Sequence, residues 1–263
     1  MLSAKTYALD VSDWSGMISE ELCKFFYLHQ TKPVIVVNAE GVLWPSNILL
    51  RFFKFIDSTP SIRKTLAKSH QLESSVSFSE EYKNRCRISR EACYIWAATL
   101  FRDLGEPLVF QWARSFWDSL SHTVYLKPIG KLIHEFHKQH FPVWVLTPTP
   151  KWVAEVGALK YNIRPENVVS TKPVLHERTI TQRLSYPPPY EIQKVFLVNS
   201  LIKTKPFIVI GHNYKDFEVL SISSSLSIVI NPPKDQLDRN NLPFINVAKS
   251  MNWSIQDFAE PSY

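Results

Sequence analysis

Two apolar runs that each end in a polar loop constrain the fold of this chain more than any other feature. The runs are VIVVNAEGVLW at 34–44 and FIVIGHNYKDFEVL at 207–220. The apolar start of each segment is typical of a strand in a parallel sheet that helices cover on both faces. In such sheets, ligands bind just beyond the carboxyl ends of the strands. We therefore expect functional side chains in the two loops, which carry Asn38 and Glu40 in the first and His212 and Asp216 in the second.

Helical and strand patterns alternate along the second half of the chain. PIGKLIHEFHKQH is followed by the apolar run VWVLT, and PKWVAEVGALKYNI is followed by NVVST. The helical periodicity of the longer segments and the short apolar runs between them predict helix–strand units. His140 and Asn162 fall where these helices end, a position that favours a left-handed residue. The pattern also predicts a β-ribbon in VLHERTITQRL, a strand in LSIVINP and an added edge strand in PFINV.

The stretch from 47 to 121 shows helical periodicity and no buried strand. We therefore predict an α/β protein with a Rossmann-like parallel sheet, formed by residues 1–46 and 122–263, and an inserted all-helical cap domain at 47–121. Aromatic residues of the cap are expected mainly in its core. The alternative is an aromatic face that docks a partner protein. These residues are Trp96, Phe101, Trp112, Phe116 and Trp117.

Composition argues against several classes of protein. The sequence has no apolar stretch of about 18 residues and no basic start followed by an apolar run, so we expect a cytoplasmic protein without membrane contact. The net charge is +6, but the basic residues are spread along the chain with no run of five, and we do not expect nucleic acid as a partner. Cys86 and Cys93 are seven residues apart in a helical pattern, which favours reduced core thiols over a disulfide.

Four short motifs resemble, in order, those of the haloacid dehalogenase superfamily, most closely its phosphoserine phosphatase-like branch with a helical cap. The first family motif, DxDGT(V/L), is matched by Asn38 to Leu43. The second, a strand ending in Ser or Thr, is matched by Thr147, and the third, a lysine at a helix start, by Lys194. The fourth, G(D/N)SxxDxxML, is matched by Gly211 to Leu220. The resemblance covers about 34–225 and implies a haloacid dehalogenase-like core.

The resemblance also assigns catalytic positions, and they are altered here. The first Asp of the family attacks phosphorus, and Asn38 stands in its place. An amide oxygen is a poor nucleophile and cannot form an acyl phosphate without losing ammonia. Glu40 stands at the position of the general acid and base, with the same carboxyl chemistry on a side chain one methylene longer.

The resemblance places the phosphate-binding residues at Thr147 and Lys194, and the metal-binding position of the fourth motif at Asp216 and His212. Thr147 supplies a hydroxyl donor and Lys194 a positive charge for a phosphoryl group. Mg²⁺ prefers hard oxygen ligands in octahedral geometry. Because Asn38 and His212 replace carboxylates, we expect weak Mg²⁺ binding at most and no other cofactor.

We therefore expect a catalytically impaired phosphatase-fold protein, a pseudophosphatase, that binds a small phosphorylated ligand or a protein partner. One alternative is a divergent phosphomonoester hydrolase resembling phosphoserine phosphatase, in which Glu40 and a metal-activated water replace the covalent route. A second alternative is a protein-interaction module.

Overall fold

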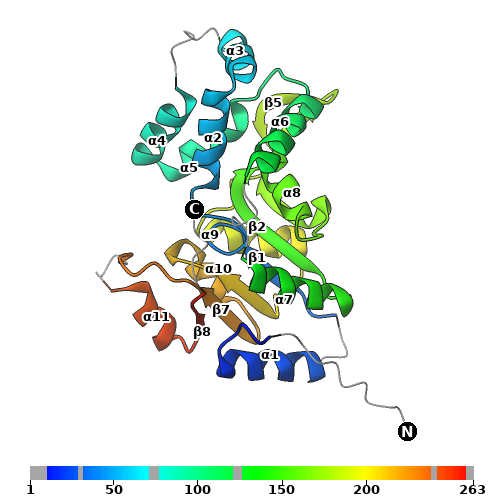
Figure 1. Cartoon of the computed structure of the whole chain (residues 1–263), viewed down its shortest axis with the longest axis vertical. Coiled ribbons are helices and arrows are strands. Elements are labelled where there is room, and N and C mark those ends of the chain that lie inside the picture. Colours follow the sequence, from blue (N-terminus) through cyan, green and yellow to red (C-terminus); the bar gives the residue numbers. More distant parts are fainter. Residues whose placement is uncertain (1–10, 29–31, 71–76, 121–125, 238–241, 259–263) are drawn as a thin grey trace.

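A six-stranded parallel sheet forms the centre of the molecule in the computed structural model, which describes residues 11–28, 32–70, 77–120, 126–237 and 242–258. The strand order is β3-β2-β1-β6-β7-β8 (Figure 1). The two apolar runs supply β1 and β6, which pair directly at the middle of the sheet. This confirms the predicted α/β class. The strands are β1 Ile35–Asn38, β2 Val143–Pro150, β3 Val168–Thr171, β6 Ile208–Gly211, β7 Leu226–Ile230 and β8 Ser254–Gln256.

Helices cover both faces of the sheet, and each face has its own hydrophobic cluster. Ile35 and Val37 of β1 belong to one cluster, and Val36 belongs to the other. Burial on both faces explains why the strands are uninterrupted apolar runs. The first cluster includes residues of α1 Gly16–Leu28, α7 Lys127–Lys138 and α8 Lys151–Leu159. The second includes residues of α9 Ile192–Leu197, a π-helical turn at Val198–Ile202, α10 Phe217–Ser221 and α11 Phe244–Ser250.

Helices α2 to α6, which follow β1 in the chain, stand over one end of the sheet (Figure 1). Their aromatic side chains pack in the same hydrophobic cluster as Val37. Four of the five aromatic residues singled out from the sequence are buried, and Trp96 is half-buried, which confirms the prediction that they are mainly core. The helices are α2 Ile48–Ser58, α3 Pro60–Ser69, α4 Phe78–Ile88, α5 Arg90–Thr99 and α6 Glu106–Ser119.

The predicted β-ribbon connects the sheet to these helices. It consists of β4 Pro173–His176 and β5 Thr179–Leu184, which pair antiparallel. Ile180 of β5 donates its N–H to the Leu104 carbonyl and accepts from the Asp103 N–H, both at 2.9 Å. The Glu106 N–H donates to the Arg178 carbonyl at 2.8 Å. Backbone hydrogen bonds therefore hold the ribbon against the loop between α5 and α6.

The segment PFINV forms the start of helix α11, so the prediction of an edge strand there was wrong. Pro243 precedes the first helical residue with φ −58°, an angle that proline adopts naturally and that suits a helix start. The edge strand is β8, further along the chain. The predicted left-handed residues are confirmed, since His140 and Asn162 both have φ 57°.

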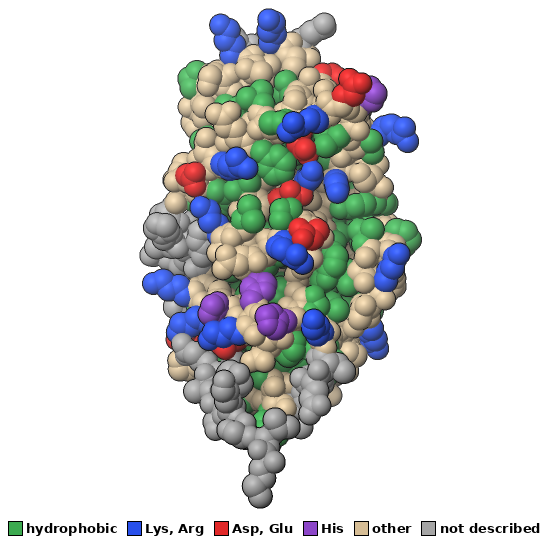
Figure 2. All heavy atoms as spheres, turned by 90° about the vertical axis from the view of Figure 1, so that its right-hand side faces the viewer, with side chains coloured by type: hydrophobic (Ala, Val, Ile, Leu, Met, Phe, Trp, Pro, Cys, Tyr) green, Lys and Arg blue, Asp and Glu red, His purple; other side chains and the backbone are tan. Residues whose placement is uncertain are grey.

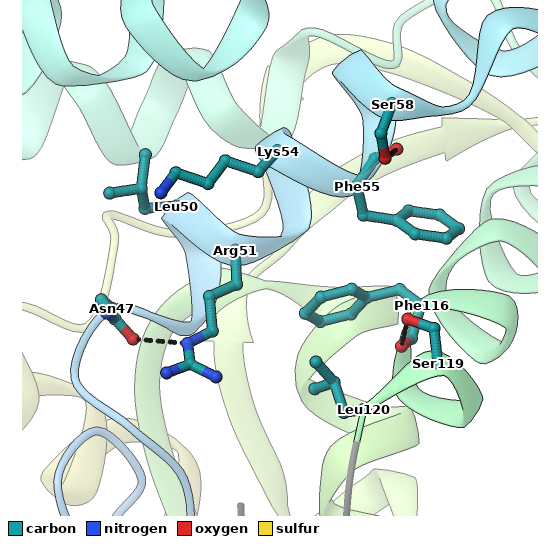
Figure 3. A pocket seen from close by; sticks show the side chains of 9 residues that line it. All are labelled: Asn47, Leu50, Arg51, Lys54, Phe55, Ser58, Phe116, Ser119 and Leu120. Carbon is teal, nitrogen blue, oxygen red and sulfur yellow. Dashed lines mark hydrogen bonds between the residues drawn. The ribbon is translucent and has the colours of Figure 1, made fainter. Parts of the chain in front are cut away.

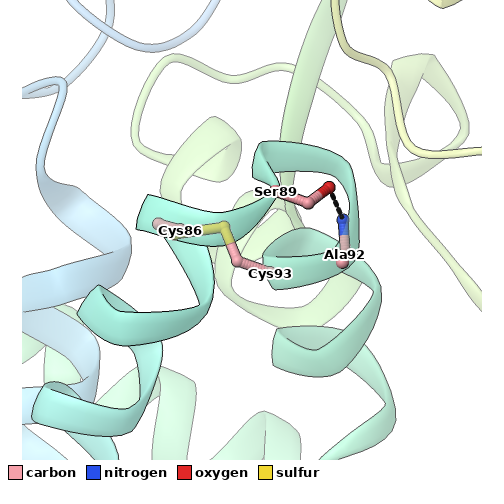
Figure 4. The surroundings of a disulfide bond; sticks show 4 residues. All are labelled: Cys86, Ser89, Ala92 and Cys93. Atoms are coloured by element: carbon pink, nitrogen blue, oxygen red, sulfur yellow. Dashed lines mark hydrogen bonds between the residues drawn. A yellow bond between two sulfur atoms is a disulfide. The ribbon is translucent and has the colours of Figure 1, made fainter.

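Cys86 and Cys93 form a disulfide, so the prediction of reduced thiols was wrong (Figure 4). In one continuous helix, residues seven apart would be separated by about 10 Å along the axis. Here α4 ends at Ile88, and Ser89 is extended with φ −153° before α5 begins. The chain turns at this residue and brings the two Cα atoms to 5.1 Å.

The surface carries dispersed charge. Figure 2 shows Lys and Arg side chains scattered over the coloured part of one face, with histidines gathered toward its lower part and another at its upper right edge. Within the described part of the chain, no helix is long and apolar enough to span a membrane. Short 3-10 turns at Pro165–Asn167 and Tyr214–Asp216 complete the regular structure.

Candidate functional site

Side chains from all four motifs lie together at the carboxyl edge of the sheet. Asn38 ends β1, and the strands on either side of it are β2 and β6. Because these strands are parallel, their carboxyl ends meet at one edge of the sheet. The loop after β6 and the start of α9 complete the group. The residues are Asn38, Glu40, Thr147, Lys194, His212 and Asp216.

Asn38 is held by a backbone carbonyl of the neighbouring strand. Its side chain is 1% exposed, and Nδ2 donates to the Ile210 carbonyl oxygen at 3.2 Å. A carbonyl only accepts, so this contact fixes the amide with its nitrogen toward β6. The other atom, Oδ1, is buried and has no hydrogen-bond partner among the described residues. A carboxylate in this place would set an acceptor against the Ile210 acceptor.

Glu40 accepts hydrogen bonds from two threonine hydroxyls. Thr147 donates to Oε1, and Thr149 donates to the same oxygen at 2.9 Å. Burial raises the pKa of the Glu40 carboxyl, although the Thr147 hydrogen bond, the Lys194 charge and the Thr149 hydrogen bond oppose the shift. The carboxyl is therefore a better proton donor near neutral pH than an exposed glutamate.

Thr149 is a site residue that the motifs do not identify. β2 continues to Pro150, so Thr147 lies inside the strand, and its hydroxyl does not cap the following helix. Residues two apart on a strand face the same side. The alternation in TPTP was therefore a signal, in the sequence, that both hydroxyls share one face.

Lys194 and Asp216 form a buried ion pair. Their side chains are each 4% exposed, and Nζ donates to Oδ1 of Asp216. The second carboxylate oxygen accepts from the His212 N–H at 2.8 Å and the Asn213 N–H at 3.3 Å. Lys194 is thus not an ordinary exposed helix lysine, and both oxygens of Asp216 already have partners.

His212 lies directly against the first loop. A Cβ atom added to Gly41 would stand 2.2 Å from the His212 ring, and Gly41 has φ +80°. Only glycine allows this close approach together with this backbone angle. Nδ1 of His212 lies 2.9 Å from the Ile230 carbonyl oxygen, so in the neutral ring this nitrogen carries the proton and Nε2 is an acceptor.

These residues do not fit a Mg²⁺ site. Asp216 is the carboxylate at the metal-binding position of the fourth motif, and the Lys194 ammonium already neutralises it. The remaining candidate ligands are the neutral amide oxygen of Asn38 and an imidazole nitrogen, which Mg²⁺ does not favour. In the part of the chain that the structure describes, no group of three or more His, Cys, Asp or Glu side chains could hold a metal ion.

Two cavities lie on the helices above the sheet, and none of the six motif residues lines either of them. The larger, of about 550 Å³, lies between α2 and α6 (Figure 3). Its apolar wall includes Phe55 and Phe116, whose ring centroids are 5.8 Å apart. On its polar side, Nε of Arg51 donates to the Asn47 side chain at 3.0 Å. The smaller cavity, of about 290 Å³, lies where α2, α4 and α5 meet.

No protein-family model and no curated protein matches the sequence. A structure of a protein of unknown function from Bordetella pertussis Tohama I has a TM-score of 0.67 at 13% identity, covering 86% of this chain and 98% of its own. A cytosolic 5'-nucleotidase IIIB bound to cytidine has a TM-score of 0.53 at 11% identity, covering 93% and 86%. A probable phosphoserine phosphatase from Vibrio cholerae has a TM-score of 0.50 at 11% identity, covering 77% and 57%. The fold is haloacid dehalogenase-like.

The haloacid dehalogenase-like fold agrees with the resemblance seen in the order of the four motifs. At 11% to 13% identity, the likeness concerns the fold and carries no activity with it. The division into core and cap and the roles of the six residues stay predictions.

Proposed function

We propose that this protein is a catalytically impaired member of the phosphatase fold, which binds a phosphate monoester group on a small molecule or on a partner protein. The amide of Asn38 carries the proposal. A covalent phosphoryl transfer needs an ionised carboxylate at the end of β1. Asn38 instead places a neutral amide there, and its Nδ2 is hydrogen-bonded to the Ile210 carbonyl of the sheet. The amide oxygen of Asn38 is a poor nucleophile.

The neighbouring groups support binding of an anion. The Lys194 ammonium can donate to an anion, since Asp216 takes only one of its three hydrogens. The hydroxyls of Thr147 and Thr149 now donate to Glu40, and each would turn from Glu40 to the phosphate when the ligand binds. Glu40 has a raised pKa and is therefore less repulsive to a phosphate than an ordinary carboxylate. Two carboxylates of the family pattern are absent, so less negative charge opposes the ligand.

The first test is hydrolysis of p-nitrophenyl phosphate with Mg²⁺, comparing wild-type protein with Glu40→Gln. We expect no turnover above the level of the variant. Turnover that depends on Glu40 would contradict the proposal and favour the divergent hydrolase.

The second test is calorimetric titration of the protein with inorganic phosphate. Removing the Thr147 hydroxyl in Thr147→Val should weaken binding by about tenfold, as expected for one hydrogen bond to a charged group. Thr99→Val is the control, because Thr99 is also buried and its hydroxyl donates to the Ile95 carbonyl within α5. Addition of EDTA should leave the affinity unchanged, since the residues do not fit a Mg²⁺ site. Absence of phosphate binding, or equal losses in both threonine variants, would refute the binding role.

A further inference from the structure

The smaller cavity is lined by cations and by no acidic residue that the structure describes. The start of α2 contributes Asn47 and Leu50, α4 contributes Tyr82 and Lys83, and the other lining residues are Ser46, Cys86, Arg87 and Arg90. Three of these eight side chains are basic. Like charges that share one cavity repel one another, and a bound anion relieves that repulsion.

Two of the three cations have no carboxylate partner among the residues that the structure describes. Lys83 pairs with Glu80 at 2.6 Å. Arg87 is exposed and donates to the neutral Asn84 side chain at 3.3 Å, and Arg90 is also exposed. Neither arginine forms an ion pair with any residue in the described ranges. Two guanidinium groups are therefore available for bidentate hydrogen bonds to an oxyanion.

The two arginines lie on a corner of the chain that is fixed at two points. The disulfide between Cys86 and Cys93 joins α4 to α5, and the Ser89 hydroxyl accepts from the Ala92 N–H at 3.2 Å (Figure 4). Arg87 and Arg90 fall inside the closed segment, and Cys86 itself lines the cavity. Fixing the backbone in advance reduces the entropy that binding would otherwise cost.

Tyr82 adds a neutral donor to the same wall. Its side chain is 9% exposed, and burial raises the pKa of the phenol, with the Arg90 charge opposing the shift. The hydroxyl therefore keeps its proton at every physiological pH and does not repel an anion. The volume of about 290 Å³ is near the lower limit for small-molecule pockets, which suits a ligand of few heavy atoms.

We propose that this cavity is a binding site for a small oxyanion with two or more negative charges, held by Arg87 and Arg90. None of the six strand-end residues lines this cavity. The group that binds would be a phosphate or a similar oxyanion, either as a free inorganic ion or at the end of a larger molecule. The phosphate chain of a nucleotide and free diphosphate both contain such a group.

The test is calorimetric titration of the full chain with inorganic diphosphate and, separately, with ADP. We expect saturable binding that Arg87→Gln with Arg90→Gln weakens by at least about tenfold, because two charge-assisted contacts are lost. Tighter binding of ADP would indicate a ligand that extends beyond its phosphates. Tighter binding of diphosphate would indicate the free ion.

The matched control is Arg114→Gln with Arg183→Gln. Both arginines are exposed and outside the cavity, so the net charge changes equally without touching the site. Equal losses in the two double variants would show nonspecific attraction and overturn the proposal. A loss in Thr147→Val alone would place the anion at the strand ends, which would overturn this inference and support the proposed function. Binding of an oligodeoxynucleotide without binding of diphosphate would also overturn it.

Discussion

At the scale of single residues, the hydrogen bond between Asn38 and Ile210 predicts that Asn38→Asp destabilises the folded protein. Asn38→Asp removes the Nδ2 donor and sets a buried carboxylate against the Ile210 carbonyl, which lies 3.2 Å from the present nitrogen. We expect a loss of about 1–3 kcal/mol in the free energy of unfolding at pH 7, measured by urea denaturation. The loss should shrink toward pH 4, because burial raises the pKa of the new carboxyl and protonation restores a donor.

Asn167→Asp is the matched control for this change. The Asn167 side chain also donates to a strand carbonyl, that of Val143 at 3.1 Å, but the residue is half-buried. Water can solvate a carboxylate there, so the loss of stability should be smaller. Equal losses in the two variants would contradict the role of burial at Asn38.

The sequence was enough to predict which residues meet at the strand ends, but not their hydrogen bonds. Parallel strands place the residues that follow them at one edge, whatever the side chains do. The Lys194 ammonium bonds to Asp216, and the Thr147 hydroxyl bonds to Glu40, because of rotamers and burial that no motif encodes. The TPTP alternation indicates the face on which Thr149 lies, but its hydrogen bond to Glu40 is seen only in the structure.

At the scale of elements, the packing of α8 against α6 depends on one glycine. A Cβ on Gly157 of α8 would lie 2.4 Å from the Trp117 ring and 3.0 Å from the Trp44 ring. Trp117 cannot easily move, since its Nε1 donates to the Val153 carbonyl at 2.8 Å. Gly157→Ala should therefore lower the free energy of unfolding by about 1–3 kcal/mol, despite the higher helix propensity of alanine.

Gly130→Ala in α7 tests a glycine at which an added Cβ has room. The added Cβ would meet only the Tyr161 ring, at 3.7 Å, an ordinary van der Waals contact. Helix propensity then dominates, and the change should raise the free energy of unfolding by up to about 1 kcal/mol. Thermal unfolding of both variants beside wild type gives the comparison. Destabilisation by both changes would show that backbone effects, and not the tryptophans, decide the outcome.

The corner between α4 and α5 shows where prediction of elements from the sequence fails. Helical periodicity continues through residues 78–99, and the turn depends on one extended residue, Ser89. That residue determines whether Cys86 and Cys93 lie along one helix or face each other. Strand and helix types elsewhere were predictable because buried parallel strands and amphipathic helices differ strongly in pattern.

At the scale of the whole molecule, Glu155 of α8 should make stability depend on pH. Burial raises its pKa to about 7, with the Lys151 and Lys172 charges opposing the shift. The folded state therefore binds this proton more tightly than the unfolded state, whose pKa is near 4.5. The contribution to stability is complete below about pH 4.5 and is lost as pH rises through about 7.

Glu155→Gln removes this titration. Relative to wild type, the variant should gain on the order of 2–3 kcal/mol in the free energy of unfolding between pH 4.5 and pH 8, followed by denaturant unfolding. Glu20→Gln removes one exposed carboxyl whose charge is not among the causes of the Glu155 shift, so it controls for the change in net charge. A flat difference between Glu155→Gln and wild type across this range would contradict the prediction.

The pairing of the β-ribbon with the loop between α5 and α6 limits how the molecule can open. Three backbone hydrogen bonds join the two segments, at Asp103, Ile180 and Glu106. A swing of α2 to α6 away from the sheet would either break all three hydrogen bonds or move the ribbon together with these helices. Access to Glu40 from solvent should therefore depend on side-chain movements near Glu40 and not on a swing of these helices.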